Sequence, residues 1–163
     1  MTDKESNLSK KKNFRPNVAA IVLSAKYPEK CEVFIASRID IKNAWQFPQG
    51  GIDKGEGARE ALFRELKEEI GTNEVEIIAE YPSWVTYEFP PTIAEKMCPF
   101  DGQKQKYYLV KLKEGAKINI NTKIPEFSDF KFISTKDIFE YITAFKRTAY
   151  KEVLSYFKKE GYL

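Results

Sequence analysis

Three glutamates, Glu65, Glu68 and Glu69, lie within one short segment whose composition favours an α-helix. Side chains at positions i, i+3 and i+4 of a helix share one face, so these carboxylates would crowd together and repel one another. A divalent cation would turn that repulsion into attraction. It would also neutralise phosphate oxygens and lower the pKa of an attacking water, which is the chemistry that cleaves a phosphoanhydride bond. The alternative interpretation is a solvated acidic face.

The surroundings of this cluster favour the metal site. Glu56 precedes the expected helix in a glycine-rich loop over residues 46–57 and can fold back toward the acidic face. Leu62, Leu66 and Ile70 recur at every fourth position and fix the opposite face to a core. The chain has no histidine, which excludes His-based zinc sites and Ser-His or Cys-His catalysis. The remaining oxygen donors suit Mg²⁺, or Mn²⁺ as a substitute.

The order and spacing of these residues resemble the Nudix box, in which conserved positions combine glycine, glutamate and an Arg-Glu pair at fixed intervals. The chain fills those positions with Gly50, Glu56, Arg64, Glu65, Leu66, Glu68, Glu69 and Gly71. Similarity to the Nudix hydrolase family implies an α/β fold, described as an α/β/α sandwich with a mixed β-sheet. The box itself would form a loop–helix–loop.

The resemblance also implies roles for the box residues. The expected metal ligands are Glu65, Glu68 and Glu69, with Glu56 supporting the cluster or its water and the Gly50 carbonyl within reach. Arg64 would orient a glutamate through a salt bridge. An ordinary i,i+4 ion pair of Arg64 with a helix neighbour is compatible with that role.

Segments that flank the box resemble a bacterial subfamily, the RNA 5′-pyrophosphohydrolases, also described as dinucleoside polyphosphate hydrolases. The segments are RPNVA at 15–19, AWQFPQGG at 44–51, GQKQKYYL at 102–109, PEF at 125–127 and FKRTAY at 145–150. Similarity to the subfamily implies that Glu126 is a further acidic metal ligand or a catalytic base, alongside Glu68 and Glu69 as candidate bases. It also implies that Arg15 and Arg38 contact phosphate, because guanidinium forks bind phosphate oxygens in pairs.

Three further residues are expected to bind substrate, each with a plainer alternative. Lys106 and Lys146 are candidate phosphate contacts, although a lysine on a strand or helix is usually only solvated. Phe145 resembles an aromatic platform on which a base could stack. It also fits the apolar stripe of the last expected helix, in which case it would belong to the core.

These observations predict a metal-dependent pyrophosphohydrolase that converts the 5′-triphosphate or diphosphate end of RNA to a monophosphate and so initiates RNA decay. Hydrolysis of diadenosine polyphosphates stays open, because both ligands offer a purine and a polyphosphate. A binding or regulatory module without catalysis is opposed by the intact set of glutamates. A plain RNA-binding protein is opposed by the crowded acidic face and by a net charge of only +3. The sequence suggests no particular protein partner.

The chain of 163 residues suits one domain, and 42% hydrophobic with 31% charged residues is a globular composition. We expect a flexible basic tail over residues 1–13 and a single domain over residues 14–163. No window approaches the ~20 apolar residues of a membrane span, and the N-terminal residues lack the apolar stretch of a signal peptide. Cys31 and Cys98 are expected to be reduced thiols, so we expect a cytoplasmic protein.

The elements expected to position the site follow from hydrophobic periodicity and turn residues. Strands are predicted over residues 17–24, 32–38, 75–80, 84–87, 106–112 and 130–134, with the first two forming a hairpin. Helices are predicted over residues 58–70 and 136–159. Residues 46–57 and 90–102 are expected to be irregular.

Overall fold

The two longest strands, β1 (Phe14–Leu23) and β7 (Gly102–Leu112), run parallel and in register at the centre of the sheet. The computed structural model describes residues 11–163. Of the tail predicted over residues 1–13, residues 1–10 lie outside the described part of the chain. β1 is buried without interruption over its last seven residues. Such a run is typical of a central strand that is covered on both faces.

Shorter strands complete an eight-stranded mixed sheet within the described residues, in the order β3-β2-β1-β7-β5, with β4, β6 and β8 pairing β1, β7 and β2 respectively. These strands are β2 (Glu32–Arg38), β3 (Trp45–Gln46), β4 (Gln49–Gly51), β5 (Val75–Glu80), β6 (Val85–Glu88) and β8 (Phe127–Ser134). The expected hairpin is reduced to one antiparallel residue pair, because β1 pairs mainly with β7 and β2 mainly with β8. β4 and the second residue of β3, Gln46, lie inside the region 46–57 that was expected to be irregular.

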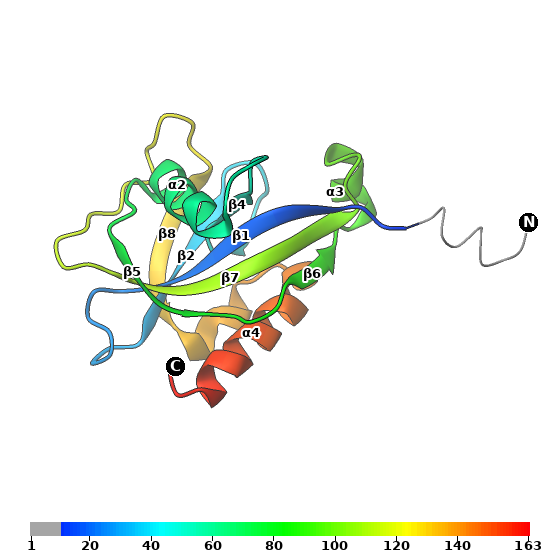
Figure 1. Cartoon of the computed structure of the whole chain (residues 1–163). Coiled ribbons are helices and arrows are strands. Elements are labelled where there is room, and N and C mark those ends of the chain that lie inside the picture. The colour runs from blue at the N-terminus through cyan, green and yellow to red at the C-terminus, as the bar shows by residue number, and fades with distance from the viewer. Residues whose placement is uncertain (1–10) are drawn as a thin grey trace, which may run out of the picture.

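Helix α2 (Ala58–Ile70) has the predicted bounds and packs on one face of the sheet, as Figure 1 shows. Its buried positions include Leu62, Leu66 and Ile70, as the periodicity predicts. The helix ends at Gly71, whose φ of 77° is left-handed and therefore favours glycine over residues that carry a Cβ.

The helix predicted over residues 136–159 is wrong in its first half. Thr135–Glu140 and Ala144–Lys146 form short 3-10 helices, and the α-helix α4 spans only Arg147–Lys159. Thr143 adopts an extended backbone between them, and Ile142 bridges to Trp45 of β3. This contact with the sheet overrides a helical apolar pattern. The region 90–102 likewise contains a short helix, α3 (Pro91–Lys96), which starts with proline in its first turn.

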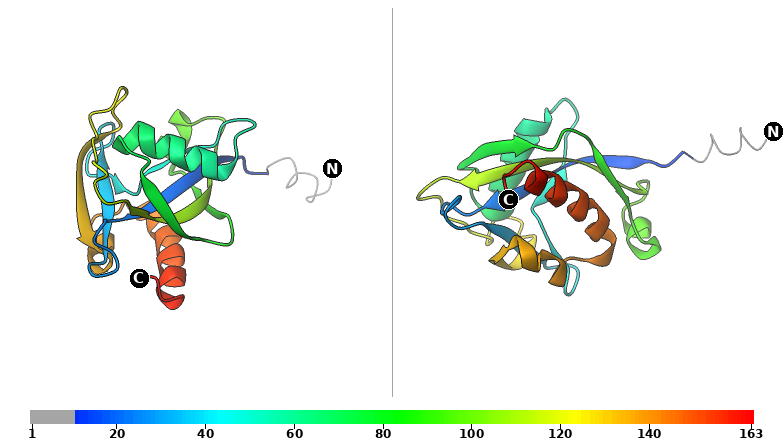
Figure 2. Two further views of the ribbon diagram at one scale, coloured as in Figure 1. Left: turned by 60° about the vertical axis from the view of Figure 1, so that its left-hand side comes forward. Right: turned by 90° about the horizontal axis from the view of Figure 1, so that it is seen from below.

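Helices α2 and α4 cover opposite faces of the sheet, as the views in Figures 1 and 2 agree. One apolar core joins the sheet to α2 through Leu62 and Leu66, and a second joins it to α4 through Val153 and Phe157. The α/β/α sandwich with a mixed sheet is therefore confirmed. In residues 11–163 no helix combines the length and apolarity that a membrane crossing requires.

Candidate active site

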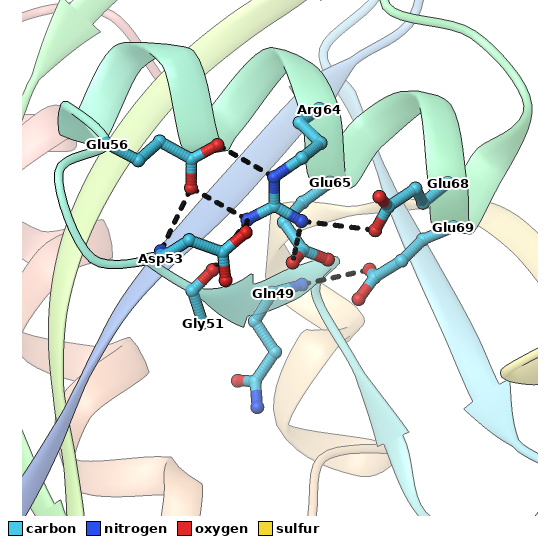
Figure 3. A network of polar contacts seen from close by, with 8 residues as sticks. All are labelled: Gln49, Gly51, Asp53, Glu56, Arg64, Glu65, Glu68 and Glu69. Atoms are coloured by element: carbon cyan, nitrogen blue, oxygen red, sulfur yellow. Dashed lines mark hydrogen bonds and ion pairs between the residues drawn. The ribbon is translucent and has the colours of Figure 1, made fainter.

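Arg64 is the centre of the polar network drawn in Figure 3. Its Nε and Nη2 donate to the two carboxylate oxygens of Glu56 at 2.7 and 2.8 Å. Nη1 donates to Glu65 at 2.8 Å and to Glu68 at 3.2 Å, and Nη2 also reaches the Gly51 carbonyl at 2.9 Å. The expected salt bridge is thus a contact with three glutamates, and it ties the loop of the box to its helix.

Glu56 is held as a carboxylate by this network. The hydrogen bonds from Arg64 lower the pKa of Glu56 to about 2, and the Asp53 amide, which donates at 3.0 Å, acts in the same direction. The side chain therefore folds back toward the helix, as the sequence suggested. Its two oxygens are engaged by Arg64 and the loop backbone, which places Glu56 in support of the cluster.

Gly50 lets the carboxyl group of Glu65 lie directly against β4. A Cβ at position 50 would overlap that carboxyl group, so a larger residue would displace it. Burial raises the pKa of Glu65 to about 6, with Arg64 opposing the rise and the charges of Glu68 and Glu126 adding to it. Glu65 is therefore a partly desolvated carboxyl that an added positive charge would stabilise.

Glu69 is the most deeply buried of the box glutamates, at 1% exposure. Its Oε2 accepts a hydrogen bond from the Gln49 amide at 3.1 Å, whereas Oε1 has no hydrogen-bond partner among the described side chains and backbone. Burial raises the pKa of Glu69 well above its usual value, and the nearby Glu126 and Glu65 reinforce the rise. A buried carboxyl oxygen without a partner is costly and calls for a proton or a cation.

The donor set fits a hard divalent cation. In the part of the chain that the structure describes, no three acidic, cysteine or histidine side chains form a ready-made metal cage. However, Glu65, Glu69 and Glu126 influence one another electrostatically, and Glu69 contributes the unpartnered oxygen. Carboxylate oxygens of this kind are the ligands that Mg²⁺ prefers. Glu68 is more exposed and turned toward Arg64.

A pocket of about 440 Å³ is lined by Glu126 and by Gln49, whose backbone amide binds Glu69. It lies within the size range of small-ligand sites. Five of the residues expected to take part in the site line it: Arg15, Arg38, Glu126, Phe145 and Lys146. They come from β1, β2, the segment before β8 and the turn before α4, so the fold gathers them from distant parts of the chain.

Tyr87 and Gln103 also line the pocket, although sequence reasoning did not select them. The Tyr87 hydroxyl and the Gln103 Oε1 are buried and lack hydrogen-bond partners within residues 11–163. Burial raises the pKa of Tyr87 to about 12, so its hydroxyl keeps its proton and can donate a hydrogen bond to a ligand oxygen. A tyrosine in an alternating strand is ordinary in sequence, and only its position in the fold identifies it.

The guanidinium group of Arg38 binds the carboxylate of a neighbouring residue. Nε and Nη2 donate to the two carboxylate oxygens of Asp40 at 2.8 and 2.6 Å. These hydrogen bonds from Arg38 lower the pKa of Asp40. Asp40, which sequence reasoning did not select, therefore competes with any phosphate for the fork of Arg38.

Lys146 is buried, at 3% exposure, and is not the solvated lysine of the plainer interpretation. Its Nζ donates to Gln46 Oε1 at 2.5 Å. Burial lowers the pKa of Lys146 to about 7, and the charge of Arg38 adds to the effect while Glu69 and Asp40 oppose it. A phosphate in the pocket would restore the charged form.

The buried lysine predicts a pH-dependent stability. The unfolded chain keeps Lys146 protonated up to about pH 10.4, whereas the folded chain releases the proton near 7, so the free energy of unfolding should rise with pH between these values. From pH 7.0 to 8.5 the contribution is about 1.5 kcal/mol. Urea unfolding of the wild type should show this gain, and Lys146→Met should lack it. Equal pH slopes for the two proteins would contradict the shifted pKa.

Of the two remaining residues expected to bind substrate, Phe145 lines the pocket and Lys106 does not. Phe145 precedes α4, lines the pocket and lies 5.7 Å from Tyr87 between ring centroids, outside the core stripe of the helix.

Lys106 is not brought to the pocket. It leaves the opposite face of β7 from Gln103, because side chains alternate along a strand, and its Nζ lies 2.9 Å from Glu80 Oε1. The structure therefore removes Lys106 from the set of expected phosphate contacts there.

The sequence signature of the NUDIX domain matches residues 13–153, and the chain therefore belongs to the Nudix family. Nudix hydrolases generally use divalent metal cations.

Curated relatives cover nearly the whole chain. A Nitratiruptor protein named RNA pyrophosphohydrolase is 67% identical over 93% of this chain and 98% of its own length. A protein of the same name from Helicobacter pylori is 59% identical over 93% and 98% of the two chains. Among solved structures, the E. coli dihydroneopterin triphosphate pyrophosphohydrolase aligns with a TM-score of 0.68 at 18% identity, over 86% of this chain and 97% of that one. A C. elegans Ap4A hydrolase aligns with a TM-score of 0.64 at 19% identity, over 88% of this chain and 98% of that one. These structural likenesses concern the fold.

Proposed function

We propose that this chain is an RNA pyrophosphohydrolase that converts the 5′-triphosphate or diphosphate end of RNA to a 5′-monophosphate with the help of Mg²⁺. The observation that carries the proposal is the pocket in which cationic and aromatic side chains lie beside Glu126 and Gln49, the residue whose amide binds Glu69 of the box. Relatives named RNA pyrophosphohydrolase at 57–67% identity support the same substrate.

Within this proposal, Glu65, Glu69 and Glu126 would hold the cation. When bound, the cation supplies charge neutralisation on the phosphate oxygens and a lowered pKa for the attacking water. A glutamate accepts the proton of that water. Glu126 lines the pocket and Glu69 binds the lining residue Gln49, whereas Glu68 is engaged by Arg64. The water oxygen bonds to phosphorus, the P–O anhydride bond breaks, and pyrophosphate or orthophosphate leaves.

Other pocket residues position the substrate. Arg15, Lys146 and the Tyr87 hydroxyl offer donors for phosphate oxygens, and charge assistance makes such bonds strong. Phe145 offers a half-exposed ring for stacking a base. Arg38 can serve phosphate only in competition with Asp40.

The product and the cysteines suggest a cellular role. A 5′-monophosphate end would be open to a nuclease that senses such ends, so the reaction would initiate RNA decay. Cys31 and Cys98 carry free thiols, which is in keeping with a reducing compartment, and we propose that the protein acts in the cytoplasm.

The test is a 5′-end assay with purified protein, 5′-triphosphorylated RNA and Mg²⁺. We expect monophosphate ends, detected by their sensitivity to a 5′-monophosphate-dependent exonuclease. Chelation should abolish the reaction, and Mn²⁺ should restore it. Diadenosine tetraphosphate offered as a competitor measures the second substrate class. Cleavage of the dinucleotide without cleavage of RNA would replace the proposed function by dinucleotide hydrolysis, and cleavage of neither would favour a binding module.

A further inference from the structure

An aromatic and basic surface lies on the other side of the strands that wall the pocket. The Trp84 side chain, directly before β6, is 46% exposed. Lys104 Nζ and Lys106 Nζ lie 5.3 and 5.9 Å from the centroid of its ring. We call Trp84, Lys104 and Lys106 the tryptophan patch.

The patch is assembled by the ladder between β6 and β7. The two strands are antiparallel, with Thr86 opposite Lys104, so Trp84 comes beside the next lysine on the same face, Lys106. Lys106 is paired with Glu80, whereas no acidic side chain of the described residues forms an ion pair with Lys104. The patch therefore keeps an unneutralised positive charge next to an accessible aromatic ring.

The patch and the pocket are adjacent. Tyr87 and Gln103, which line the pocket, are paired with each other in this ladder. The next pair along, Thr86 and Lys104, faces the opposite side with the patch. Within residues 11–163, β6 pairs with β7 alone, so its other edge is free and β6 lies at the border of the sheet (Figure 1). A flexible chain leaving the pocket needs only to pass this edge to reach Trp84.

We propose that the tryptophan patch binds the single-stranded RNA that follows the 5′-terminal nucleotides of the substrate. This proposal extends the proposed function to the body of the same RNA. A ring with free surface offers stacking for a base of any sequence, and lysines beside it offer charge for the phosphate backbone, which together are the usual elements of single-strand binding. The positive charge of the lysines disfavours a cationic surface as partner, and the ring distinguishes the patch from a merely solvated basic face.

The test measures binding apart from hydrolysis. A single-stranded RNA of about 12 nucleotides, with a 5′-hydroxyl and a 3′ fluorescent label, is titrated with the protein and followed by anisotropy. Trp84→Leu keeps an apolar side chain and removes the stacking surface, and we expect it to weaken binding about tenfold. Trp84→Tyr keeps an aromatic ring and should bind within a factor of about two of wild type. Equal affinities of wild type and Trp84→Leu would overturn the proposal.

Alanine substitutions of Lys104 and Lys131 test whether the positive charge of the patch contributes to RNA binding. Lys104→Ala should weaken binding and reduce the dependence of affinity on salt by about one phosphate contact. Lys131 also lies over a tryptophan, 4.7 Å from the centroid of Trp45, but outside the patch. Lys131→Ala should leave affinity and salt dependence unchanged. Equal losses in the two alanine variants would show a non-specific charge effect and would overturn the proposal.

The two proposals fail separately. The 5′-hydroxyl RNA has no phosphoanhydride bond, so its binding does not depend on turnover. Binding that depends on Trp84, without any cleavage of triphosphorylated RNA, would support the patch and reject the proposed function. Cleavage of RNA with binding that is indifferent to Trp84 would do the reverse.

Discussion

Replacement of Glu69 by glutamine is expected to lower the turnover of triphosphorylated RNA about a thousandfold while the protein stays folded. The substitution removes the negative charge of the buried group but keeps its volume, and the amide oxygen can still accept the hydrogen bond from Gln49. Since the carboxyl group is 1% exposed and has one unpartnered oxygen, the neutral amide should not lower the free energy of unfolding. Single-turnover assays at saturating Mg²⁺ and thermal unfolding give the two quantities.

Glu60 provides the matched control for this experiment. It lies on the same helix as Glu69, but its side chain is exposed and outside the pocket. Glu60→Gln makes the same change of charge and should leave turnover within a factor of about two, as expected for a surface substitution away from the site. Near-normal turnover by Glu69→Gln would show that the assignment of the metal site is wrong.

Replacement of Arg64 by lysine is expected to lower both stability and turnover. The guanidinium contacts Glu56, Glu65 and Glu68 through separate N–H groups, and lysine cannot reproduce this fork. We expect the free energy of unfolding to fall by about 2 kcal/mol, a value reduced for the partial exposure of the site. Turnover should fall about a hundredfold, because the carboxylates lose the group that orients them. Urea unfolding and the 5′-end assay measure the two effects.

Arg147→Lys is the control, because Arg147 is exposed at the start of α4 and its Nε donates a hydrogen bond to the backbone carbonyl of Ile142, away from the carboxylates. It should change neither quantity appreciably. If Arg64→Lys lost stability but kept full turnover, Arg64 would be a structural residue of the box and would not position the carboxylates.

The sequence alone determined the parts of the site that depend on local spacing. The bounds of the box helix, residues 58–70, followed from the period of Leu62, Leu66 and Ile70 and from the glycine at position 71. The spacing of the box residues identified the family, which the comparison confirms. Such features can be predicted from sequence because they depend on interactions between residues a few positions apart.

The tertiary structure decided which of these side chains meet and in what environment. The expected helix over residues 136–159 was interrupted by a contact with β3. Lys146 was expected as a phosphate contact or as a solvated lysine, and the packing around Gln46 buries it at the pocket, so only the solvated alternative is wrong. Both outcomes depend on segments far apart in the chain.

The clearest contrast is between Gln103 and Lys106 on β7. Alternation along a strand requires that they point to opposite faces, and this much can be derived from sequence. Which face adjoins the pocket depends on where α2 and α4 pack, and no local pattern encodes that choice. The residue types and their spacing thus defined the chemistry, whereas packing of distant elements placed Tyr87 and Gln103 in the pocket and Lys106 beside Trp84.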